Sequence, residues 1–418
     1  MLPAAPDPNP LTLDPSPRKR VLVLASTFPR WANDTEPPFV YNLSRSLADS
    51  FDVTVLAPHA PGSTLVEEMD GLTVRRFRYF WPAGLQKLAY GGILPNLKRN
   101  RWLWAQVPFF LLAEFLAARS IVRRDSIDVI HAHWLVPQGV VGALLSEVTG
   151  KPVVVTAHGA DVYGANGGIK DKLKRWALRR TARVTAVSQD LANAIDRLMG
   201  EDTPVEVISM GVDTERFRPA TGPSELRQRL GGGPIVLFVG RLAEKKGVRY
   251  LLEAMPAVLT EAPDATLVIV GDGPLRADLE AQARALSISD NVRFEGAKRP
   301  DELPAYYHAA DVFAGPSIVA EGGDTESFGL VFAEAMACGC PVVASNVGGI
   351  GDLVKDGETG MVVSQKDPEA LALGICHVLA DETLHARLRR GGLAHIQGNY
   401  TQTAIAGRYA ELLEGVAA

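Results

Sequence analysis

The stretch from Asp324 to Val343, DTESFGLVFAEAMACGCPVV, carries two carboxylates eight positions apart, Glu326 and Glu334. Its apolar run over 331–337, followed by a glycine and a β-branched run, predicts a helix that leads into a strand. Glu326 would lie just before this helix and Glu334 nearly two turns inside it, and eight helical residues rise about 12 Å. Such an offset could place the carboxylates at the two ends of one extended ligand. The pattern is equally compatible with a partly exposed Glu334 and with Glu326 as a partner of the helix dipole.

The same alternation of strand and helix patterns runs through the rest of the chain. Short β-branched runs alternate with longer amphipathic runs, which is typical of parallel sheets covered by helices on both faces. The predicted strands are 21–25, 53–57, 129–132, 153–157, 184–187 and 205–208, and then 235–240, 266–270, 292–295, 312–314, 341–344 and 360–363. A segment rich in Pro and Gly separates the two series, so we expect two doubly wound α/β domains that face each other across a cleft.

Composition excludes several classes of protein. The chain has 418 residues, 47% hydrophobic and 22% charged, with a net charge of −5 and three cysteines, which fits a globular protein in a reducing compartment. No His or Cys cluster has zinc-ligand spacing, and the first twenty residues lack the apolar core of a signal peptide. The longest apolar stretch, 102–118, contains Pro108 and Glu114 and falls short of the roughly 20 residues that span a bilayer. We therefore expect a cytoplasmic protein without a transmembrane helix.

A loop in the second half has the pattern of an anion site. Gly240-Arg241-Leu242 directly follows a predicted strand, and Lys246-Gly247 precedes the predicted helix 248–259. Free backbone N–H groups at a helix start attract anions, and Arg241 and Lys246 would add two positive charges. On this loop alone, a solvated turn with ordinary surface cations is an equally good interpretation.

Together these motifs resemble a known family in order and spacing. Gly240-Arg241-Leu242 with Lys246-Gly247, Gly271-Asp-Gly-Pro274, the opening stretch and Gly348-Gly349 resemble the donor domain of the family 4 retaining glycosyltransferases, which have the GT-B fold. In the first half, 130–134, 156–159 and 187–188 resemble the family's landmarks more loosely. The first residues are rich in Pro and Asp, which predicts a disordered lead-in over 1–18. The resemblance implies an acceptor-binding domain over 19–215 and a donor-binding domain over 216–399. It also implies that a helix over 400–418 packs back on the first domain.

The resemblance implies roles for individual residues. It assigns the diphosphate of a nucleotide sugar to Arg241 and Lys246 with the N–H groups of Gly329 and Leu330, and the ribose hydroxyls to Glu334. It assigns the donor sugar to His158, Glu326, Ser327, Phe328 and Gly329, and the base to Gly296, Ala297 and Lys298. His158, Glu326, Arg241 and Lys246 are the candidate catalytic residues. A structural histidine stays open as an alternative for His158, and His131 and His133 are expected to be structural.

The implied reaction depends on electrostatics. A departing nucleoside diphosphate gains negative charge, which preorganised cations and helix N–H groups stabilise. The sequence has no Asp-X-Asp motif, the ligand pair of many metal-dependent sugar transferases, so we expect no metal and no cofactor. The expected donor is a UDP- or GDP-sugar, and the expected acceptor is a glycan, a lipid-linked sugar or a small molecule, in cell-surface polysaccharide or glycolipid synthesis. A sugar phosphorylase, a nucleotide-sugar epimerase and a non-catalytic nucleotide-sugar-binding subunit are alternatives.

Two segments of the first half stand apart. Residues 26–39 replace the paired glycines with which many relatives open their first loop, so the contacts from this side stay open. Residues 71–113 contain seven Lys or Arg, no acidic residue and many aromatics. This mixture suits docking on an anionic inner membrane face, and it equally suits aromatics in a core with cations on a solvated face. The acidic total and the absence of a binding module argue against a nucleic-acid partner.

Overall fold

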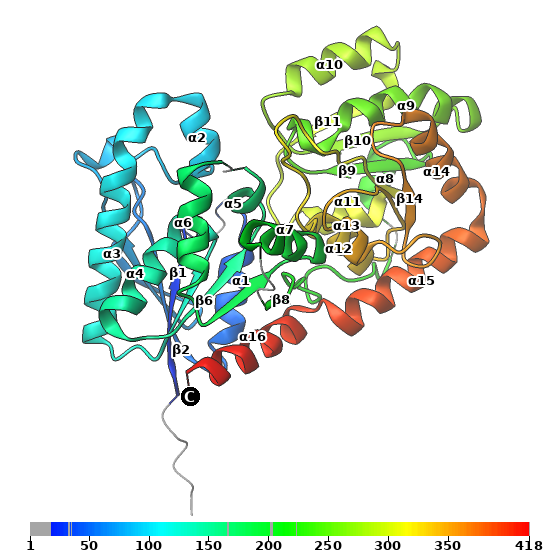
Figure 1. The fold of residues 1–418 in the computed structure, drawn as a ribbon. Helices are drawn as coiled ribbons and strands as arrows, with labels where there is room; N and C mark the ends of the chain where they lie inside the picture. The colour runs from blue at the N-terminus through cyan, green and yellow to red at the C-terminus, as the bar shows by residue number, and fades with distance from the viewer. Residues whose placement is uncertain are drawn as a thin grey trace, which may run out of the picture.

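The computed structural model describes residues 18–31, 34, 36–164, 167–200, 204–222 and 224–417. Apart from Arg18, the lead-in predicted over 1–18 lies outside the described residues. The described chain forms two α/β domains, which lie side by side in Figure 1. The expectation of two parallel-sheet domains is therefore confirmed.

The first sheet has the strand order β3-β4-β2-β1-β5-β6-β7-β8. Its central strands are parallel and fully buried, because β-branched runs such as VLVL and VVVT are covered on both faces. Only the β3–β4 pair is antiparallel among the pairings of this sheet that the structure describes. The strands are β1 (Arg20–Leu24), β2 (Asp52–Pro58), β3 (Val66–Met69), β4 (Leu72–Phe77), β5 (Val129–His133), β6 (Val153–Ala157), β7 (Arg183–Ala186) and β8 (Val205–Val207).

The second sheet is parallel, with the strand order β11-β10-β9-β12-β13-β14. One apolar cluster fills the first domain and extends into the second, and another fills the opposite face of the second sheet. The strands are β9 (Ile235–Val239), β10 (Thr266–Val270), β11 (Val292–Gly296), β12 (Val312–Gly315), β13 (Val342–Ser345) and β14 (Met361–Val363).

Helices cover both faces of each sheet (Figure 1). Those of the first domain are α1 (Phe39–Leu47), α2 (Ile93–Arg99), α3 (Val107–Arg124), α4 (Val140–Thr149), α5 (Ala160–Tyr163), α6 (Ile169–Leu178) and α7 (Gln189–Met199). They are followed by α8 (Glu225–Arg229), α9 (Val248–Glu261), α10 (Arg276–Ala285), α11 (Leu303–Ala309), α12 (Leu330–Ala337), α13 (Ile350–Leu353), α14 (Pro368–Ala380), α15 (Glu382–Asn399) and α16 (Gln402–Val416). Short helical turns are η1 (Ala83–Leu85), η2 (Arg101–Gln106), η3 (Leu135–Gly139), η4 (Glu244–Lys246) and η5 (Ser289–Asn291).

The chain crosses between the domains at two places that lie together. Val212 N–H donates to Tyr400 O at 2.8 Å, and Gln402 N–H donates to Val212 O at 2.9 Å. The second crossing leads into α16, which packs on α1 and returns beneath the first domain (Figure 1). There Tyr409 is buried, and its hydroxyl donates to Ile208 O at 3.1 Å. The predicted boundary at 215/216 falls between β8 and β9.

Two features of the first domain differ from the sequence interpretation. The hairpin β3–β4 was not predicted, because its edge strand alternates weakly and carries two glutamates. The expectation that the apolar stretch 102–118 is too short to span a bilayer was also wrong. The helical run Arg101–Arg124 is, within the described residues, long and apolar enough to cross a membrane by length and composition. In the structure Phe110, Glu114 and Ala118 on this run are buried inside the first domain.

Candidate functional site

The predicted anion loop is built by two turns packed against each other. Leu242 N–H donates to Asp272 O at 3.0 Å, which joins the turn after β9 to the turn after β10. A Cβ on Gly271 would lie 1.9 Å from Gly240 O, so only glycine permits this approach. The turn after β11 joins them, because Gly271 N–H donates to Gly296 O at 2.8 Å. The carboxyl ends of β9, β10 and β11 therefore form one continuous rim.

The two predicted diphosphate cations differ in their surroundings. Arg241 is exposed at the end of β9, and its charge acts on Glu36 of the first domain. Burial raises the pKa of Glu36, while Gly91 N–H, Arg30 and Arg241 offset part of that increase. Lys246 is mostly buried and forms an ion pair with Glu326. Sequence reasoning missed Glu36, because nothing in the sequence indicates that it faces Arg241 from the other domain.

Glu326 is ionised in this environment. Burial by itself raises the pKa of its carboxyl, but Lys246 and Lys245 together lower it below the usual value. Lys245 Nζ also lies 3.1 Å from Asp324 Oδ1. Residues 324–326 therefore meet two ammonium groups, and the prediction of Glu326 as a simple partner of the helix dipole omitted these ion pairs.

The segment Ser327–Gly329 leads into α12, as the sequence predicts. Leu330 is the first helical residue, with Gly329 at the N-cap and no side-chain capping hydrogen bond. The N–H groups of this first turn face away from the helix body, which is the usual geometry of an anion site. The side chain of Phe328 is buried and packs against Tyr400 at the crossing between the domains, with ring centroids 5.7 Å apart.

Glu334 lies on α12 and is half-buried. The hydroxyl of Tyr307 donates to its Oε2 at 2.8 Å. Burial raises the pKa of Glu334 to about 7, although the Tyr307 hydroxyl, Arg216 and Lys246 favour the ionised form. Near neutral pH this carboxyl is therefore poised between its two protonation states, so a ligand that donates hydrogen bonds to it would favour ionisation.

The predicted base-binding residues lie at the end of β11. Gly296 is the last residue of the strand, and Ala297 is exposed after it. Lys298 Nζ lies 3.3 Å from Glu295 Oε2 and 5.6 Å from the ring centroid of Tyr306. Lys298 is thus engaged within its own domain, while the backbone at Gly296 and Ala297 remains accessible beside the rim.

His158 lies in a cluster of rings at the end of β6. Its Nε2 is 2.9 Å from Nδ1 of His133, and its ring lies at a tilt to those of Phe39 and Trp134, with centroids 5.1 and 4.9 Å away. Burial lowers the pKa of His158 to about 3, so the imidazole is neutral. His133 is fully buried on β5, and its pKa is also lowered. The prediction that His133 is structural is therefore incomplete, because it directly contacts the candidate catalytic histidine.

Asp161, which sequence reasoning missed, holds the loop that carries His158. Its carboxylate accepts hydrogen bonds from the N–H groups of His158 at 3.2 Å, Gly159 at 2.8 Å and Leu135 at 2.6 Å. An aspartate three residues after the histidine, at the start of a short helix, was the available signal. His131 lies inside the sheet, where its Nε2 is 2.8 Å from Thr156 Oγ1 and its ring centroid is 4.2 Å from that of His133.

The two halves of the site touch at Gly159 and Ser327. A Cβ on Gly159 would lie 1.6 Å from Ser327 Oγ, and the φ of Gly159 is +110°. A second contact joins the domains nearby, where Gln189 N–H donates to Asp352 Oδ2 at 2.7 Å. The structure thus brings His158 from the first domain next to the segment Glu326–Gly329 of the second, as the sequence predicts.

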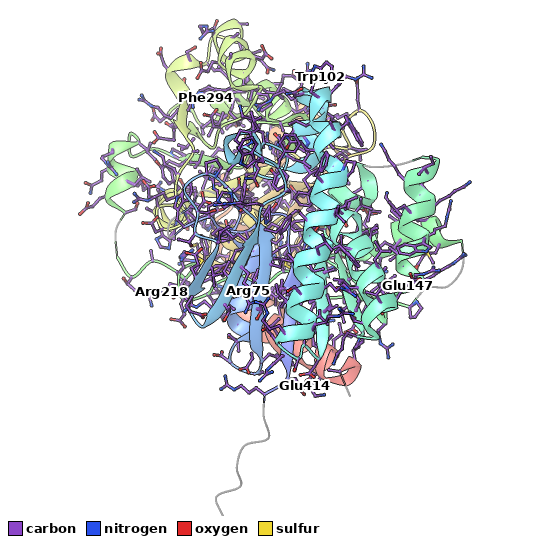
Figure 2. All side chains as sticks on the ribbon, turned by 90° about the vertical axis from the view of Figure 1, so that its left-hand side faces the viewer. Arg75, Trp102, Glu147, Arg218, Phe294 and Glu414 are labelled. Carbon is purple, nitrogen blue, oxygen red and sulfur yellow. The ribbon has the colours of Figure 1, made fainter. Side chains whose placement is uncertain are left out.

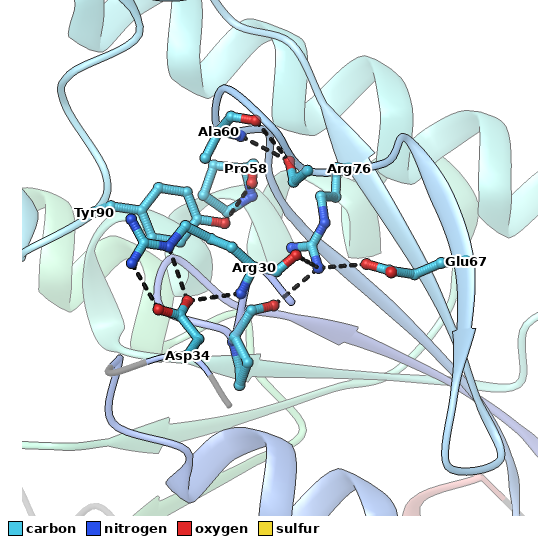
Figure 3. Close-up of polar contacts among 9 residues, drawn as sticks. Arg30, Asp34, Pro58, Ala60, Glu67, Arg76 and Tyr90 are labelled. Atoms are coloured by element: carbon cyan, nitrogen blue, oxygen red, sulfur yellow. Dashed lines mark hydrogen bonds and ion pairs between the residues drawn. The ribbon is translucent and has the colours of Figure 1, made fainter. Parts of the chain in front are cut away.

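The loop that replaces the paired glycines is held by a buried arginine (Figure 3). Arg76 Nη2 donates to Pro29 O at 2.8 Å and to Glu67 Oε1 at 2.7 Å. Arg30 forms a two-point ion pair with Asp34, at 2.6 and 2.8 Å, and its guanidinium stacks on Tyr90. The loop is therefore fixed by side chains instead of glycines.

These contacts correct part of the membrane hypothesis for 71–113. Arg76 is buried, and Arg75 pairs with Asp125 at 2.9 Å, so neither presents a free cation. Some aromatic residues fit the alternative of a core, and others fit that of a membrane-docking surface. Phe77, Tyr79 and Phe110 are core residues, whereas Trp81, Trp102, Trp104 and Phe109 are exposed. In Figure 2, Trp102 projects at one end of the first domain, far from Glu414 at the other.

The part of the chain that the structure describes offers no set of side chains that could bind a metal ion. Within those residues, no group of three or more His, Cys, Asp or Glu side chains is arranged to hold a metal ion.

Comparisons with known proteins agree with this geometry. Residues 226–394 match the family model described as Glycosyl transferases group 1, and residues 38–216 match Glycosyltransferase Family 4. The chain is 33% identical, over 71% of its length and 79% of the relative, to a Mycolicibacterium smegmatis GDP-mannose-dependent alpha-(1-6)-phosphatidylinositol monomannoside mannosyltransferase. It is 33% identical to a D-inositol 3-phosphate glycosyltransferase of Salinispora arenicola, over 85% of this chain and 82% of that one.

Solved structures show the same fold. Sucrose-phosphate synthase from Thermosynechococcus elongatus superposes with a TM-score of 0.78 at 24% identity, over 96% of this chain and 99% of that one. Anabaena HepE in complex with UDP and glucose superposes with a TM-score of 0.73 at 23% identity, over 95% and 100%.

Proposed function

The chain belongs to the glycosyl transferases group 1 and is a nucleotide-sugar glycosyltransferase of the GT-B type, and on this premise we propose the reaction that it catalyses. It transfers a hexose from a UDP- or GDP-sugar to an acceptor hydroxyl, with retention of the anomeric configuration and without a metal ion or other cofactor. The observation that carries this proposal is the Lys246–Glu326 ion pair at the start of α12, opposite His158.

The cationic rim stabilises the leaving group. When the bond between the anomeric carbon and the diphosphate breaks, the electron pair and its charge go to the diphosphate oxygen. Arg241, Lys246 and the N–H groups of Gly329 and Leu330 lie where that charge would develop, and preorganised donors of this kind lower the barrier. The positive charges that neutralise the diphosphate are therefore supplied by the protein itself.

Retention requires the acceptor to attack on the face from which the diphosphate leaves. The acceptor oxygen forms the new bond to the anomeric carbon, and its proton passes to the departing diphosphate oxygen. His158 is neutral, and burial favours that neutral form, so it is suited to orient the donor sugar by a hydrogen bond instead of carrying a charge. Ionised Glu326 holds Lys246 beside the diphosphate and faces the donor sugar.

Acceptor and location form part of the same proposal. The Mycolicibacterium relative is named for a phosphatidylinositol monomannoside, which supports a lipid-linked acceptor here. We place the reaction in the cytoplasm, at the inner membrane face, in cell-surface glycolipid or polysaccharide synthesis. The exposed cations Lys98, Arg99 and Arg101 adjoin exposed Trp102 and Trp104, and such a mixture binds anionic interfaces.

A donor panel tests the reaction. A thermal-shift screen should find a nucleoside diphosphate that stabilises the protein by about 2.7 kcal/mol at 100 times its dissociation constant. The matching sugar nucleotide should then be turned over in the presence of EDTA to a product of unchanged anomeric configuration. Loss of turnover in EDTA would contradict metal independence. Nucleotide binding without turnover on any acceptor would favour the non-catalytic subunit.

Vesicle sedimentation tests the membrane contact separately. The protein should bind phosphatidylcholine vesicles containing phosphatidylglycerol more tightly than vesicles of phosphatidylcholine alone. Replacing Lys98, Arg99 and Arg101 by alanine should remove that difference, whereas replacing the exposed Arg387 and Arg390 on α15 should not. Equal binding by all variants would sink the membrane proposal.

A further inference from the structure

The first domain contains a partly open apolar cavity that the donor site does not use. A cavity of about 290 Å³ lies between α2, η2, α3, α4 and α6. Its apolar walls come from Leu97, Trp104, Val107, Phe110, Leu111 and Val140. Ligand pockets are commonly lined mostly by apolar side chains with a few polar groups, and this cavity has such a lining.

The polar end of the cavity adjoins the candidate catalytic centre. Ser26, Thr27 and Asp161 line it there, at the carboxyl ends of β1 and β6. Asp161 is the residue whose carboxylate accepts the N–H groups of His158 and Gly159. A molecule in the cavity would therefore have its polar end beside the loop that carries His158, while its other end lies among apolar side chains.

The opposite side of the cavity reaches the exposed aromatic surface. Trp104 lines the cavity and is 49% exposed, and the Lys170 ammonium lies 5.9 Å from its ring centroid. Trp102, which is 85% exposed, lies two residues before it on η2. The cavity thus connects the catalytic centre with the surface that carries Lys98, Arg99 and Arg101.

We propose that this cavity binds the hydrocarbon chain of the acceptor, so that the substrate class is an amphipathic molecule with a sugar or polyol head and an alkyl chain. The inference rests on the proposed function for the identity of the acceptor. The head lies beside His158, and the chain passes between α3 and α6 toward the η2 surface. Each methylene that enters the cavity leaves water, which gives the chain a length-dependent affinity.

Calorimetric titration with n-alkyl β-glucosides tests the proposal without any donor. Probes from butyl to decyl, kept below their critical micelle concentrations, should bind the full chain with roughly fourfold higher affinity for each added methylene, or about 0.8 kcal/mol. The gain should stop once the cavity is full. Affinity that does not depend on chain length, or no binding by any probe, would overturn the proposal.

Adjacent residues of α3 provide a matched pair of variants. Leu111 lines the cavity, whereas Leu112 is 55% exposed and does not. Leu111→Trp should fill the cavity and abolish the chain-length dependence, whereas Leu112→Trp should bind the probes like the unchanged protein. Equal binding by both variants would contradict the assignment.

Nucleotide binding separates this proposal from the proposed function. Both variants should keep the thermal shift with UDP or GDP, because the donor rim is in the other domain. If Leu111→Trp loses that shift through misfolding, the smaller change Val107→Phe on the same wall replaces it. An unchanged protein that binds alkyl glucosides but no nucleotide would sink the glycosyltransferase proposal and leave the cavity assignment standing.

Discussion

His133 Nδ1 lies 2.9 Å from His158 Nε2, so a histidine buried in the first sheet fixes the one that faces the cleft. Both imidazoles are neutral, because burial lowers both pKa values. The shared hydrogen bond therefore needs one ring proton between them, and it couples the tautomer of His158 to that of His133. His133 acts through His158 and is a positioning residue.

Replacing His133 tests this coupling. His133→Ala should lower kcat about tenfold to a hundredfold with little change in nucleotide affinity, because the loss is one of orientation. His133→Asn should restore part of kcat, since its amide occupies a position close to that of Nδ1. His377→Ala, on the exposed side of α14, is the control and should be neutral. Equal kcat in His133→Ala and the unchanged protein would contradict a positioning role.

Substitutions of Lys246 and Glu326 should affect nucleotide binding and turnover differently. Lys246→Ala should weaken nucleoside diphosphate binding by about 1.5–3 kcal/mol, since it removes a charge-assisted contact. Glu326→Gln should keep nucleotide binding and lose most turnover. Lys245→Ala is the comparison and should cost less affinity, because Lys245 is hydrogen-bonded to Asp324, although it also lowers the pKa of Glu326. Titration calorimetry measures the affinities, and equal losses in Lys245→Ala and Lys246→Ala would reject the assignment.

The raised pKa of Glu334 predicts that nucleotide affinity depends on pH. Its pKa is raised to about 7 by burial, and hydrogen bonds from ribose hydroxyls would lower it again. Binding should therefore release a proton near pH 7, and affinity should fall as the pH drops below 7. Calorimetry in buffers of different ionisation enthalpy detects the proton. Glu334→Gln should bind more weakly and without that pH dependence, and proton uptake on binding would contradict the prediction.

Gly159 and Ser327 set how closely the domains approach. Gly159→Ala should lower turnover strongly while the protein stays folded, because the new Cβ would lie 1.6 Å from Ser327 Oγ. Ser327→Gly in the same chain should recover part of the loss, although the positive φ of Gly159 leaves some strain. Gly351→Ala is a control, since its Cβ would meet open space. Full activity of Gly159→Ala would show that the contact is absent during turnover.

The raised pKa of Glu114 predicts that the stability of the fold depends on pH. It is fully buried on α3 beside Gln138, and burial raises its pKa to about 8, above the usual 4.5. The folded state keeps the proton while the unfolded state loses it, so stability falls as the pH rises from about 4.5 through 8. Glu114→Gln should therefore raise Tm relative to the unchanged protein, increasingly from pH 5 to pH 8. Exposed Glu414→Gln should show no such trend, and a constant difference in Tm would contradict the prediction.

The sequence by itself determined the two-domain α/β fold and located the glycine-bearing turns of the rim. Periodicity locates a strand wherever β-branched runs are buried on both faces, and the predicted strand 153–157 matches β6. Glycine-bearing turns after β9 and β10 likewise mark an anion site, because their positions depend on local backbone geometry. Arg241, Lys246, Glu326 and Glu334 stand out by such local signals, but roles for them are implied only by the family resemblance.

Only the tertiary structure decided what those residues meet. Arg76 looks like a surface cation in the sequence, yet it is buried against the first loop. His133 and His158 are 25 residues apart, and Arg241 and Glu36 come from different domains, so no local pattern joins them. The apolar cavity likewise arises where separate helices leave a space between them. Contacts of this kind depend on packing between distant segments, and a local sequence pattern carries no information about them.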